Sequence, residues 1–255
     1  MKLSIDTVAR TLTQTEGATV TTLDLYSKQA FEALSLQWVR TGWALGYYHT
    51  FSWFGLPILQ LPEDLVRTQE VIYQLRPQVI IETGIFRGGS ALFYASILEA
   101  LGEGSVIAID IHIPAKVRRN LESHPLSKRI TLIEKSSTDA ATLAQVKNLI
   151  GEAAPVLVLL DSDHSKNHVA VELELYAPLV TPGSYLVAAD GFMKDISDVP
   201  GASPDWKTDN PNAAACAFAA AHPEFVQAQP AWPHRQSELS ENVTYWPGGW
   251  LQRIR

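Results

Sequence analysis

Four residues in two short stretches of the chain combine acidic and imidazole side chains in a pattern suited to hydroxyl chemistry. The sequence LLDSDHS carries Asp161, Asp163 and His164, and the sequence VAADG carries Asp190. Two carboxylates held close together repel each other unless one takes a proton or a cation lies between them. Mg²⁺ prefers oxygen ligands and usually keeps several waters. We therefore predict that Asp161 and Asp190 bind a divalent cation, with Asp163 as a third ligand or supporting residue.

His164 is the predicted base of this group. An imidazole with a pKa of about 6.5 could take a proton from a substrate hydroxyl. A metal-bound hydroxyl is more acidic still, so the metal and His164 would act together, with Asp161 assisting. Structural alternatives stay open: Asp161 or Asp163 could cap a helix, and His164 could serve only to hold the metal site. His168, one helical turn later, is expected mainly to pack.

A second group with chemical potential is the glycine-rich turn ETGIFRGGSA, residues 82–91. Gly84 permits a tight turn, and Gly88 and Gly89 remove side chains so that a ligand can approach the backbone. The helix start that follows offers unpaired N–H groups. Dinucleotides and S-adenosylmethionine (SAM) both bind turns of this kind. The spacing favours SAM, because Phe86 stands where the dinucleotide fingerprint has its second glycine, and a bulky residue there would obstruct a pyrophosphate.

Acidic residues mark the ends of two predicted strands beside this turn. Glu82 could accept a hydrogen bond from the amino group of SAM, and Asp110, which ends SVIAID, could accept from both ribose hydroxyls. Together the turn and Asp110 indicate an adenosine ligand. A packing turn and a solvated carboxylate are the structural alternatives. Further residues at the same strand ends complete the predicted cofactor site: Arg87, Ser90, Ile111, Ser137 and Asp161.

Repeated strand–helix units must position these residues. Near-continuous apolar runs predict strands over 79–84, 105–110, 130–135, 155–161 and 183–190. Runs without alternation are typical of parallel strands that are buried on both faces. Helices are predicted between and after them, over 88–101, 114–124, 139–151 and 166–180. The fold class is therefore α/β, a Rossmann-like, doubly wound and mostly parallel sheet of about seven strands, whose ligands lie at the carboxyl ends of the strands.

The two ends of the chain depart from this rhythm. Residues 1–23 are polar and rich in Thr, and we expect them to be weakly structured. Residues 23–46 have helical spacing, and an aromatic cluster follows over 43–54. We assign 1–64 to an N-terminal helical and aromatic segment, a lid or an interface, and 65–255 to the α/β domain. Late elements of that domain are a helix over 213–221 and the strands FVQAQ and WLQRI, the last of them antiparallel.

Composition excludes several classes of protein. The 255-residue chain has a net charge of −7 and no basic run, which argues against a nucleic-acid surface. No segment approaches the ~20 apolar residues of a membrane span, and the start of the chain lacks the apolar centre of a signal peptide. The single cysteine, Cys216, fits a reducing environment, so we expect a cytoplasmic location. Cys216 itself is expected to be a small buried residue of its helix.

Four blocks of the chain resemble the cephalosporin hydroxylase-type family, which includes rhamnosyl O-methyltransferases: IIETGIFRGGSALFYAS, VIAIDI, VLLDSDHSKNHVAVELELYAPLVTPGSYLV and GGWLQRI. The resemblance implies the class I SAM-dependent methyltransferase fold, with SAM at Glu82, Gly84 and 88–90 and with Asp110 on the ribose. It also implies Mg²⁺ held by Asp161 and by an acidic pair after the next strand. The family usually has Glu-Asp there, whereas this chain has Ala189-Asp190, so one carboxylate is missing or is replaced by Asp163 or water.

The predicted function is methyl transfer from SAM to a hydroxyl of a small molecule, a sugar or a glycosylated metabolite, with assistance from Mg²⁺. Three alternatives come from other classes. An NAD-dependent dehydrogenase is disfavoured by Phe86, a non-catalytic SAM-binding protein is favoured by Ala189, and an Fe(II) oxygenase is disfavoured by the βα repeats. No nucleic-acid partner is expected. The aromatic cluster is a candidate contact for a homo-oligomer, a wall of the acceptor pocket, or part of the core.

Overall fold

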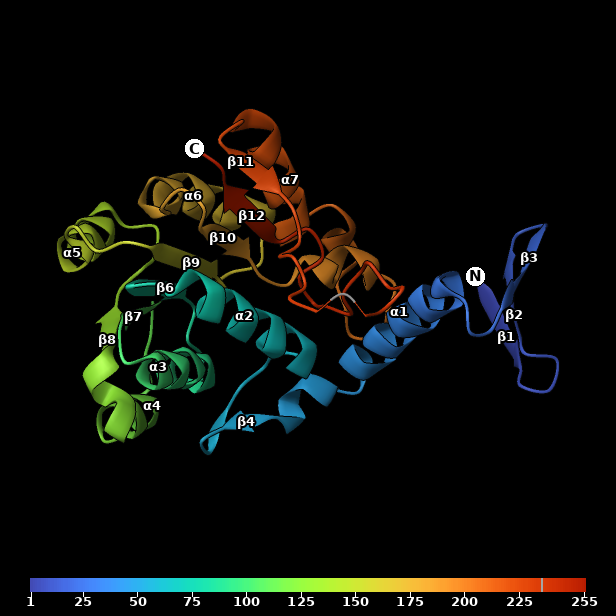
Figure 1. Cartoon of the computed structure of the whole chain (residues 1–255), viewed down its shortest axis with the longest axis horizontal. Helices are drawn as coiled ribbons and strands as arrows, with labels where there is room; N and C mark the ends of the chain where they lie inside the picture. Colours follow the sequence, from blue (N-terminus) through green and yellow to red (C-terminus); the bar gives the residue numbers. More distant parts are fainter. Residues whose placement is uncertain (235) are drawn as a thin grey trace.

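The computed structural model describes residues 1–234 and 236–255. Its centre is a seven-stranded sheet in the order β11-β12-β10-β9-β6-β7-β8 (Figure 1). The parallel strands are β6 (Val79–Thr83), β7 (Ser105–Asp110), β8 (Ile130–Glu134), β9 (Val156–Leu160) and β10 (Tyr185–Ala188). β12 (Trp250–Arg253) runs antiparallel to both β10 and β11 (Phe225–Gln227). The predicted doubly wound, mostly parallel sheet is confirmed.

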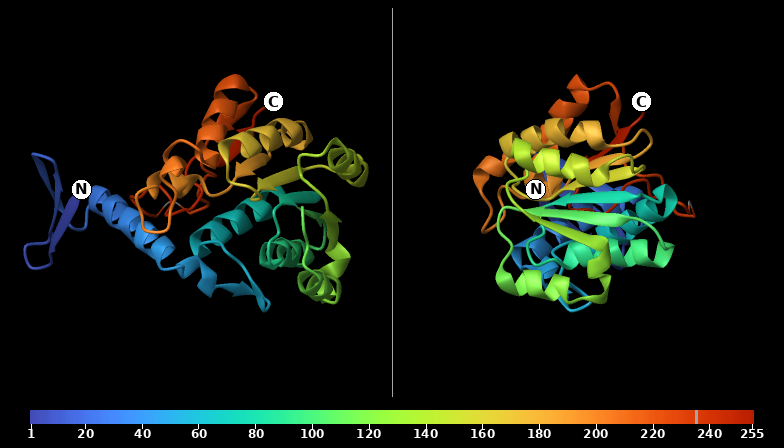
Figure 2. Two further views of the ribbon diagram at one scale, coloured as in Figure 1. Left: turned by 180° about the vertical axis from the view of Figure 1, so that it is seen from behind. Right: turned by 90° about the vertical axis from the view of Figure 1, so that its left-hand side faces the viewer.

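Two layers of helices cover the sheet (Figure 2). One face carries α2 (Pro62–Leu75), α3 (Gly89–Leu101) and α4 (Ala115–Glu122), and the other carries α5 (Ala140–Ile150), α6 (Lys166–Tyr176) and α7 (Pro211–Ala221). Successive strand side chains point to opposite layers, so Ile80 packs in the first and Ile81 in the second. Because both faces are covered, β6 and β9 are buried at every position. The sequences of these two strands are therefore continuous apolar runs.

The strand order brings the predicted site residues to one edge. β6 lies between β7, which follows it in the chain, and β9, which comes two strands later. The connections leave β6 in opposite directions, and such a switch point opens a crevice at the carboxyl ends of the strands. β10 pairs with β9 on the far side. The turns after β6, β7, β9 and β10 therefore share this edge.

Residues 1–23 are not weakly structured, so that prediction is wrong. They form an antiparallel sheet of β1 (Lys2–Asp6), β2 (Thr11–Glu16) and β3 (Thr19–Asp24). β-Branched Thr suits a pleated strand even where no face is buried. This sheet stands away from the body at the far end of α1 (Lys28–Ala44) (Figure 1). We call it the N-terminal sheet. Within residues 1–24 only Leu12 is buried.

The aromatic cluster returns the chain from α1 to the body through a 3₁₀ turn (Tyr47–Thr50) and the short strands β4 (Ser52–Trp53) and β5 (Leu56–Pro57). Three of its rings pack edge-on against rings of the body, in the pairs Trp43–Trp206, Tyr48–Tyr245 and Trp53–Phe93. Phe54 is 64% exposed. The cluster is therefore mostly joined to the body rather than free.

Proline begins two helices, the second of which the sequence placed two residues later, over 213–221. α2 starts at Pro62 and α7 at Pro211, and the side chain of Asn210 caps α7 by accepting from Ala213 N at 2.8 Å. Cys216 is exposed on α7, so the prediction that it is buried is wrong. The buried face of α7 consists of Ala214, Ala215 and Phe218. Other 3₁₀ turns lie at Pro125–Arg129, Ala177–Leu179, Gly191–Asp195 and Pro204–Lys207. Among the described residues, none of the helices has the length and apolar character to cross a membrane.

Candidate functional site

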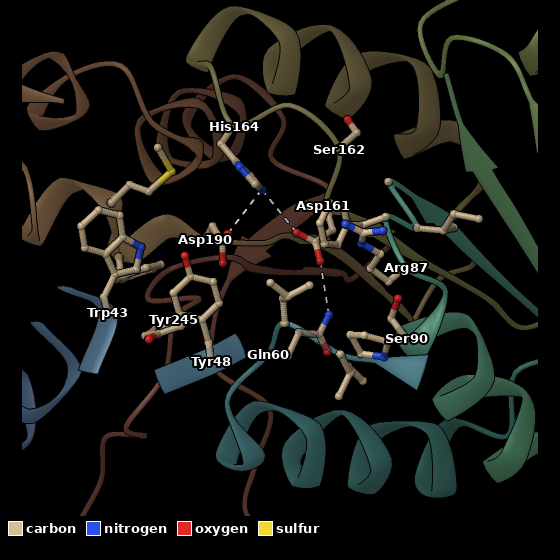
Figure 3. A pocket seen from close by; sticks show the side chains of 18 of the residues that line it. Trp43, Tyr48, Gln60, Arg87, Ser90, Asp161, Ser162, His164, Asp190 and Tyr245 are labelled. Carbon is tan, nitrogen blue, oxygen red and sulfur yellow. Dashed lines mark hydrogen bonds and ion pairs between the residues drawn. The ribbon is translucent and has the colours of Figure 1, made fainter. Parts of the chain in front are cut away.

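Two adjoining cavities open at the carboxyl edge of the sheet. The first, of about 340 Å³, is the acidic cavity, whose polar lining is Gln60, Arg87, Ser90, Asp161, His164 and Asp190 (Figure 3). Its aromatic wall is Trp43, Tyr48, Phe192, Trp206 and Tyr245. The second, of about 460 Å³, is the serine cavity, lined by Asp110, Ile111, Ser136, Ser137, Thr138 and His168. Gly84 and Ser162 line both cavities, so the two meet at the ends of β6 and β9.

Three side chains converge in the acidic cavity. Nε2 of His164 lies 3.3 Å from Oδ1 of Asp161 and 3.4 Å from Oδ2 of Asp190 (Figure 3). One potential ligand atom from each of the three residues lies within 4.8 Å of the others. Asp161 follows β9 and Asp190 follows β10, and these strands are parallel neighbours. The two aspartates therefore lie at the ends of neighbouring strands, as their predicted convergence requires.

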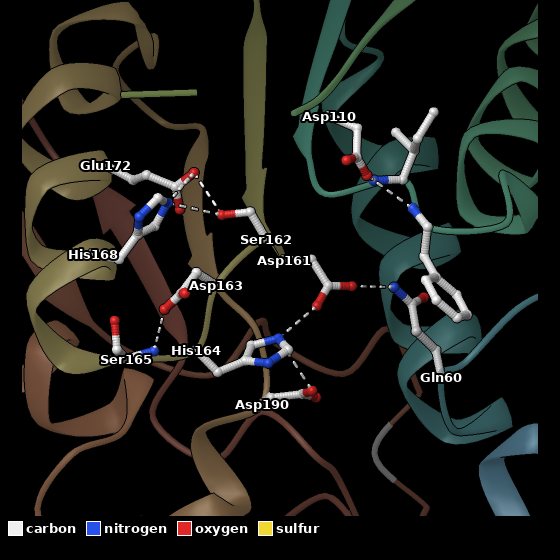
Figure 4. A network of polar contacts seen from close by, with 12 residues as sticks. Gln60, Asp110, Asp161, Ser162, Asp163, His164, Ser165, His168, Glu172 and Asp190 are labelled. Carbon is white, nitrogen blue, oxygen red and sulfur yellow. Dashed lines mark hydrogen bonds and ion pairs between the residues drawn. The ribbon is translucent and has the colours of Figure 1, made fainter. Parts of the chain in front are cut away.

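Asp163 does not join this cluster. Its carboxylate accepts a hydrogen bond from Ser165 N at 2.8 Å, at the start of α6 (Figure 4). Hydrogen bonds from Ser165 lower the pKa of Asp163. This contact is an Asx turn that leads into α6, whose cap residue is Ser165 rather than Asp163. Ala189 offers no ligand atom, and the third donor that the structure brings to the two aspartates is the imidazole of His164. A role for Asp163 at a metal stays a prediction.

The charges of the cluster favour a cation between the carboxylates. Burial raises the pKa of Asp190, an effect that His164 opposes and Asp161 reinforces. Burial alone would lower the pKa of His164, but the negative charges of Asp190 and Asp161 outweigh it and raise the pKa to about 9. The main causes of the two shifts differ: burial raises the pKa of Asp190, and neighbouring negative charge raises the pKa of His164. Both shifts indicate that added positive charge is favourable at this cluster. Two carboxylates with open space beside them also suit Mg²⁺, which keeps several waters, so the residues present fit this ion.

The glycine turn is packed more closely than predicted. A Cβ atom at Gly84 would lie 2.0 Å from the carbonyl oxygen of Asp161, so the turns after β6 and β9 touch there. A Cβ at Gly88 would lie 2.9 Å from Leu121, and one at Gly89 would lie 2.2 Å from the carbonyl oxygen of Pro57. Protein atoms therefore fill the space beside Gly88 and Gly89, where the sequence analysis expected room for a ligand. Close packing against Pro57 explains Gly89, whereas Gly88 is explained by its left-handed backbone, with φ of 82°, together with the contact to Leu121.

Asp110 organises the glycine turn. Its Oδ2 accepts from the backbone N–H groups of Ile85 and Phe86 at 3.0 and 3.2 Å, and its Oδ1 accepts from His112 N at 3.0 Å. Each carboxylate oxygen can accept more than one hydrogen bond, so Asp110 keeps capacity for ribose hydroxyls. It lines the serine cavity together with the predicted residues Ile111 and Ser137. Ribose binding stays a prediction that this position supports.

Glu82 lies beneath the start of α3, out of contact with solvent. It is 0% exposed, and neither carboxylate oxygen is accessible at the surface. Burial raises its pKa well above the usual range, with Ser90 acting in the opposite direction. Contact between Glu82 and the amino group of SAM stays a prediction, and it requires the ligand to reach a buried oxygen. Arg87 and Ser90, by contrast, line the acidic cavity.

Sequence reasoning missed the residues that hold the walls of the acidic cavity. The side-chain amide of Gln60 donates to Oδ2 of Asp161 at 3.2 Å. Asp64, buried on α2, accepts from Tyr245 N at 2.9 Å and from the hydroxyl of Thr244. Tyr245 in turn stacks on Phe192 with ring centroids 4.0 Å apart. These contacts join segments far apart in the chain, and no local pattern marks them.

The fold and the site together define a class of protein. A parallel sheet carries a glycine turn after β6, an acid at the end of β7, and a carboxylate–imidazole cluster after β9 and β10. This arrangement is that of the Rossmann-like methyltransferases.

Comparison with known proteins identifies the family. The family model described as rhamnosyl O-methyltransferase/CmcI matches residues 45–254. The chain therefore belongs to this family. Membership confirms the predicted class, a SAM-dependent O-methyltransferase. The match includes most of the aromatic cluster and leaves the N-terminal sheet and α1 outside it.

The chain is similar to curated rhamnosyl O-methyltransferases. It is 34% identical over 161 residues to the protein of Mycobacterium leprae (strain TN), an alignment that covers 62% of this chain and 68% of the relative. It is 33% identical over 171 residues to that of Mycobacterium bovis (strain BCG), covering 62% and 66%. The alignments thus span about two thirds of these relatives.

Solved structures of CmcI share the fold. The apo-structure superposes with a TM-score of 0.53 at 20% identity, covering 81% of this chain and 77% of that one. A structure of CmcI with Mg and SAM gives a TM-score of 0.52 at 19% identity, covering 81% and 78%. At this identity the likeness supports the fold alone.

Proposed function

We propose that the protein methylates a hydroxyl of a sugar or of a glycosylated small molecule, with SAM in the serine cavity and the acceptor in the acidic cavity. The observation that carries this assignment is the meeting of the two cavities at Gly84 and Ser162. One cavity has a strand-end acid suited to ribose, and the other has an acid–imidazole cluster beside aromatic rings. Such walls, with few convergent polar groups, are typical of sites for ring-shaped small molecules.

Each residue has a distinct part in the proposed reaction. SAM supplies an electrophilic methyl group on a sulfonium. Asp110 would hold the ribose, and the aromatic wall would hold the acceptor so that its hydroxyl oxygen and the methyl carbon are in line and about 3 Å apart. His164 would take the hydroxyl proton. Its position between two acids, at the base of the acidic cavity, is suited to that task.

Asp161 and Asp190 would hold Mg²⁺, which supplies a charge that makes a nearby hydroxyl more acidic. His164 would then face carboxylates whose charge is offset. Its pKa would fall from about 9 toward neutrality, and the neutral imidazole could accept the proton. The relatives' names support the sugar acceptor. Membership of the rhamnosyl O-methyltransferase/CmcI family supports the ligand set, because CmcI has been solved with Mg and SAM.

A binding and turnover experiment tests this function. Calorimetry with S-adenosylhomocysteine (SAH) and with NAD⁺ establishes the cofactor. Methyl-labelled SAM is then incubated with enzyme, Mg²⁺ and simple rhamnosides, and methyl ethers are sought by mass spectrometry. We expect SAH to bind, NAD⁺ not to bind, and label to enter the glycoside. NAD⁺ binding alone would overturn the proposal. SAH binding without transfer to any glycoside would favour the non-catalytic alternative that Ala189 suggests.

We also propose that copies of the chain associate through the outer face of α1. Two residues spaced by seven, Trp38 in α1 and Leu45 at its end, lie on one face there and are 43 and 81% exposed. Phe31, which is 40% exposed, instead lines cavities that face the body. The predicted aromatic contact would thus lie mainly on α1, because most rings of the cluster face the body. A cytoplasmic location stays part of the proposal and rests on the single cysteine, Cys216.

A further inference from the structure

A buried carboxylate stands behind the serine cavity. Glu172, on α6, is 0% exposed, and its Oε1 accepts from the hydroxyl of Ser162 at 2.8 Å (Figure 4). Nε2 of His168, one turn earlier on the same helix, lies 3.5 Å from the same oxygen. Oε2 of Glu172 is buried without a hydrogen-bond partner among the described residues. Burying a carboxylate is costly, so these few donors must be held firmly by it.

The surroundings of His168 determine which nitrogen carries a hydrogen. Besides Glu172, its Nε2 faces the hydroxyl oxygens of Ser162 at 3.2 Å and Ser137 at 3.4 Å. The Ser162 hydroxyl hydrogen is used on Glu172, because a carboxylate only accepts. Ser162 can therefore only accept from His168. It follows that Nε2 carries a hydrogen, whether the ring is neutral or protonated.

Ser137 is then left with a hydroxyl hydrogen to donate. Nε2 of His168 has a single hydrogen, which Ser137 at 3.4 Å shares with Ser162 at 3.2 Å. Because this side of Ser137 faces a donor, the hydroxyl hydrogen of Ser137 is free for another acceptor. Ser137 is 6% exposed and lines the serine cavity. Its backbone carbonyl is fixed from behind by the hydroxyl of Tyr176, which donates to it at 2.9 Å. The hydroxyl of Ser137, oriented by His168 and Glu172, can thus donate a hydrogen bond to a ligand in the serine cavity.

The position of Ser137 selects one part of a nucleoside. Asp110 ends β7, and Ser137 follows β8, the next strand outward. Both residues line the serine cavity, so a ribose held at Asp110 leaves the part of the cavity beside Ser137 for the base. The edge of the base remote from the glycosidic bond would then face Ser137. In adenine, the ring nitrogen on that edge, N1, is an acceptor. In hypoxanthine the same nitrogen carries a hydrogen.

We propose that Ser137, held by His168 and Glu172, donates a hydrogen bond to N1 of adenine and so makes the enzyme select an adenosine cofactor over its deaminated analogue. Ser137 is the residue that touches the base, and His168 and Glu172 are positioning residues. The proposal rests on the proposed function, because it takes SAM as the occupant of the serine cavity. A polar site that is matched to one hydrogen-bonding pattern rejects a ligand with the reversed pattern.

Calorimetry with SAH and S-inosylhomocysteine tests this selection. The wild-type enzyme should bind SAH on the order of tenfold more tightly or better, since a donor facing N1–H loses its bond and meets another donor. Ser137→Ala should weaken SAH binding and bring the ratio of the two affinities close to one. His168→Phe should do the same. His168→Gln, whose side-chain amide can still donate to Ser137, should keep most of the preference.

His222→Phe is the matched control. His222 pairs with Glu174 and Glu224 at the surface and lines neither cavity, so its replacement should leave both affinities unchanged. A wild type that binds neither nucleoside would refute the proposed function. Equal binding of both, or a Ser137→Ala variant with the wild-type ratio, would refute the selection by Ser137 while leaving SAM binding intact. If His168→Phe fails to fold in circular dichroism, the Ser137→Ala ratio decides.

Discussion

At the scale of single residues, His164 is the group on which proton removal depends. We predict that His164→Gln lowers the rate of methyl transfer by about 10²–10⁴-fold, the usual contribution of a general base. SAH affinity should be nearly unchanged, because His164 lines the acidic cavity and not the serine cavity. Single-turnover rates and SAH calorimetry measure the two effects. His112→Gln, at an exposed position that lines neither cavity, is the control. Equal losses of rate and of SAH affinity in His164→Gln would argue for a structural role instead.

The acidic cluster makes a second prediction at the same scale. Asp161→Asn and Asp190→Asn should each weaken Mg²⁺ or Mn²⁺ binding by at least about tenfold, because each removes a charged oxygen ligand. Asp163→Asn should not, since the asparagine side-chain oxygen can accept the same hydrogen bond from Ser165 N. Titration with Mn²⁺ followed by electron paramagnetic resonance measures binding without turnover. Weaker binding in Asp163→Asn than in Asp190→Asn would reverse the assignment.

The sequence was enough to predict which residues form the acidic cluster, but it did not show why two of the glycines in the turn are required. Asp161, His164 and Asp190 follow apolar strands, and the ends of parallel strands meet at one edge. Gly88 and Gly89 also follow a strand, yet they are required because Leu121 and Pro57 pack against them. Those neighbours are distant in the chain. A bulky replacement of Gly88 would therefore test the packing of α3 rather than ligand access.

At the scale of elements, the acidic cavity depends on how α2 holds the segment that carries Tyr245. Burial raises the pKa of Asp64 from 3.8 to about 7, although its hydrogen bonds to Thr244 and Tyr245 favour the charged form. Between these values the folded protein binds more protons at this site than the unfolded chain does. The stability contributed by Asp64 is therefore greatest below about pH 4 and is lost as the pH rises through about 7.

We predict that Asp64→Asn removes this pH dependence. An amide keeps the size of the side chain and is neutral at every pH. Relative to the variant, the wild type should lose free energy of unfolding, on the order of a few kcal/mol, between pH 4 and pH 8. Urea unfolding of both proteins across this range measures the difference, in which the other titrating groups cancel. Glu152→Gln, at an exposed position whose charge is not among those that shift the pKa of Asp64, is the control. A constant difference would mean that Asp64 is charged throughout.

Helices and strands could be predicted where their burial requires a recognisable pattern of apolar residues. The strands β6 to β10 are buried on both faces and read as apolar runs, and their bounds agree with the prediction to within a few residues. The N-terminal sheet has almost no buried face, so its strands carry no alternation to detect. Helix α1 was extended too far toward Leu23 because apolar spacing continues into β3. The side chain of Ser27, which accepts from Ala30 N, marks the true start.

At the scale of the whole molecule, the N-terminal sheet and the outer face of α1 lack a partner within the described chain. α1 is fixed to the body by Val39, which is buried, and by Arg40, which pairs with Asp198 at 2.9 Å. The N-terminal sheet has two free edge strands and a single buried side chain, Leu12. Small sheets of this kind need packing against another surface to be stable. A second copy of the chain is the occupant we expect.

We predict that the protein is an oligomer in solution and that Trp38→Asp dissociates it. Trp38 is 43% exposed on the same outer face of α1 as Leu45, and aromatic anchors of this kind contribute about 2 kcal/mol or more, roughly thirtyfold in Kd. Light scattering during size-exclusion chromatography, over a range of concentrations, measures the change. Tyr73→Asp, at a 61% exposed position on α2, is the control for a charge placed on an exposed aromatic. A wild type that is monomeric at every concentration would contradict the predicted association. An oligomer that survives Trp38→Asp would show that the copies associate through a surface other than this face of α1.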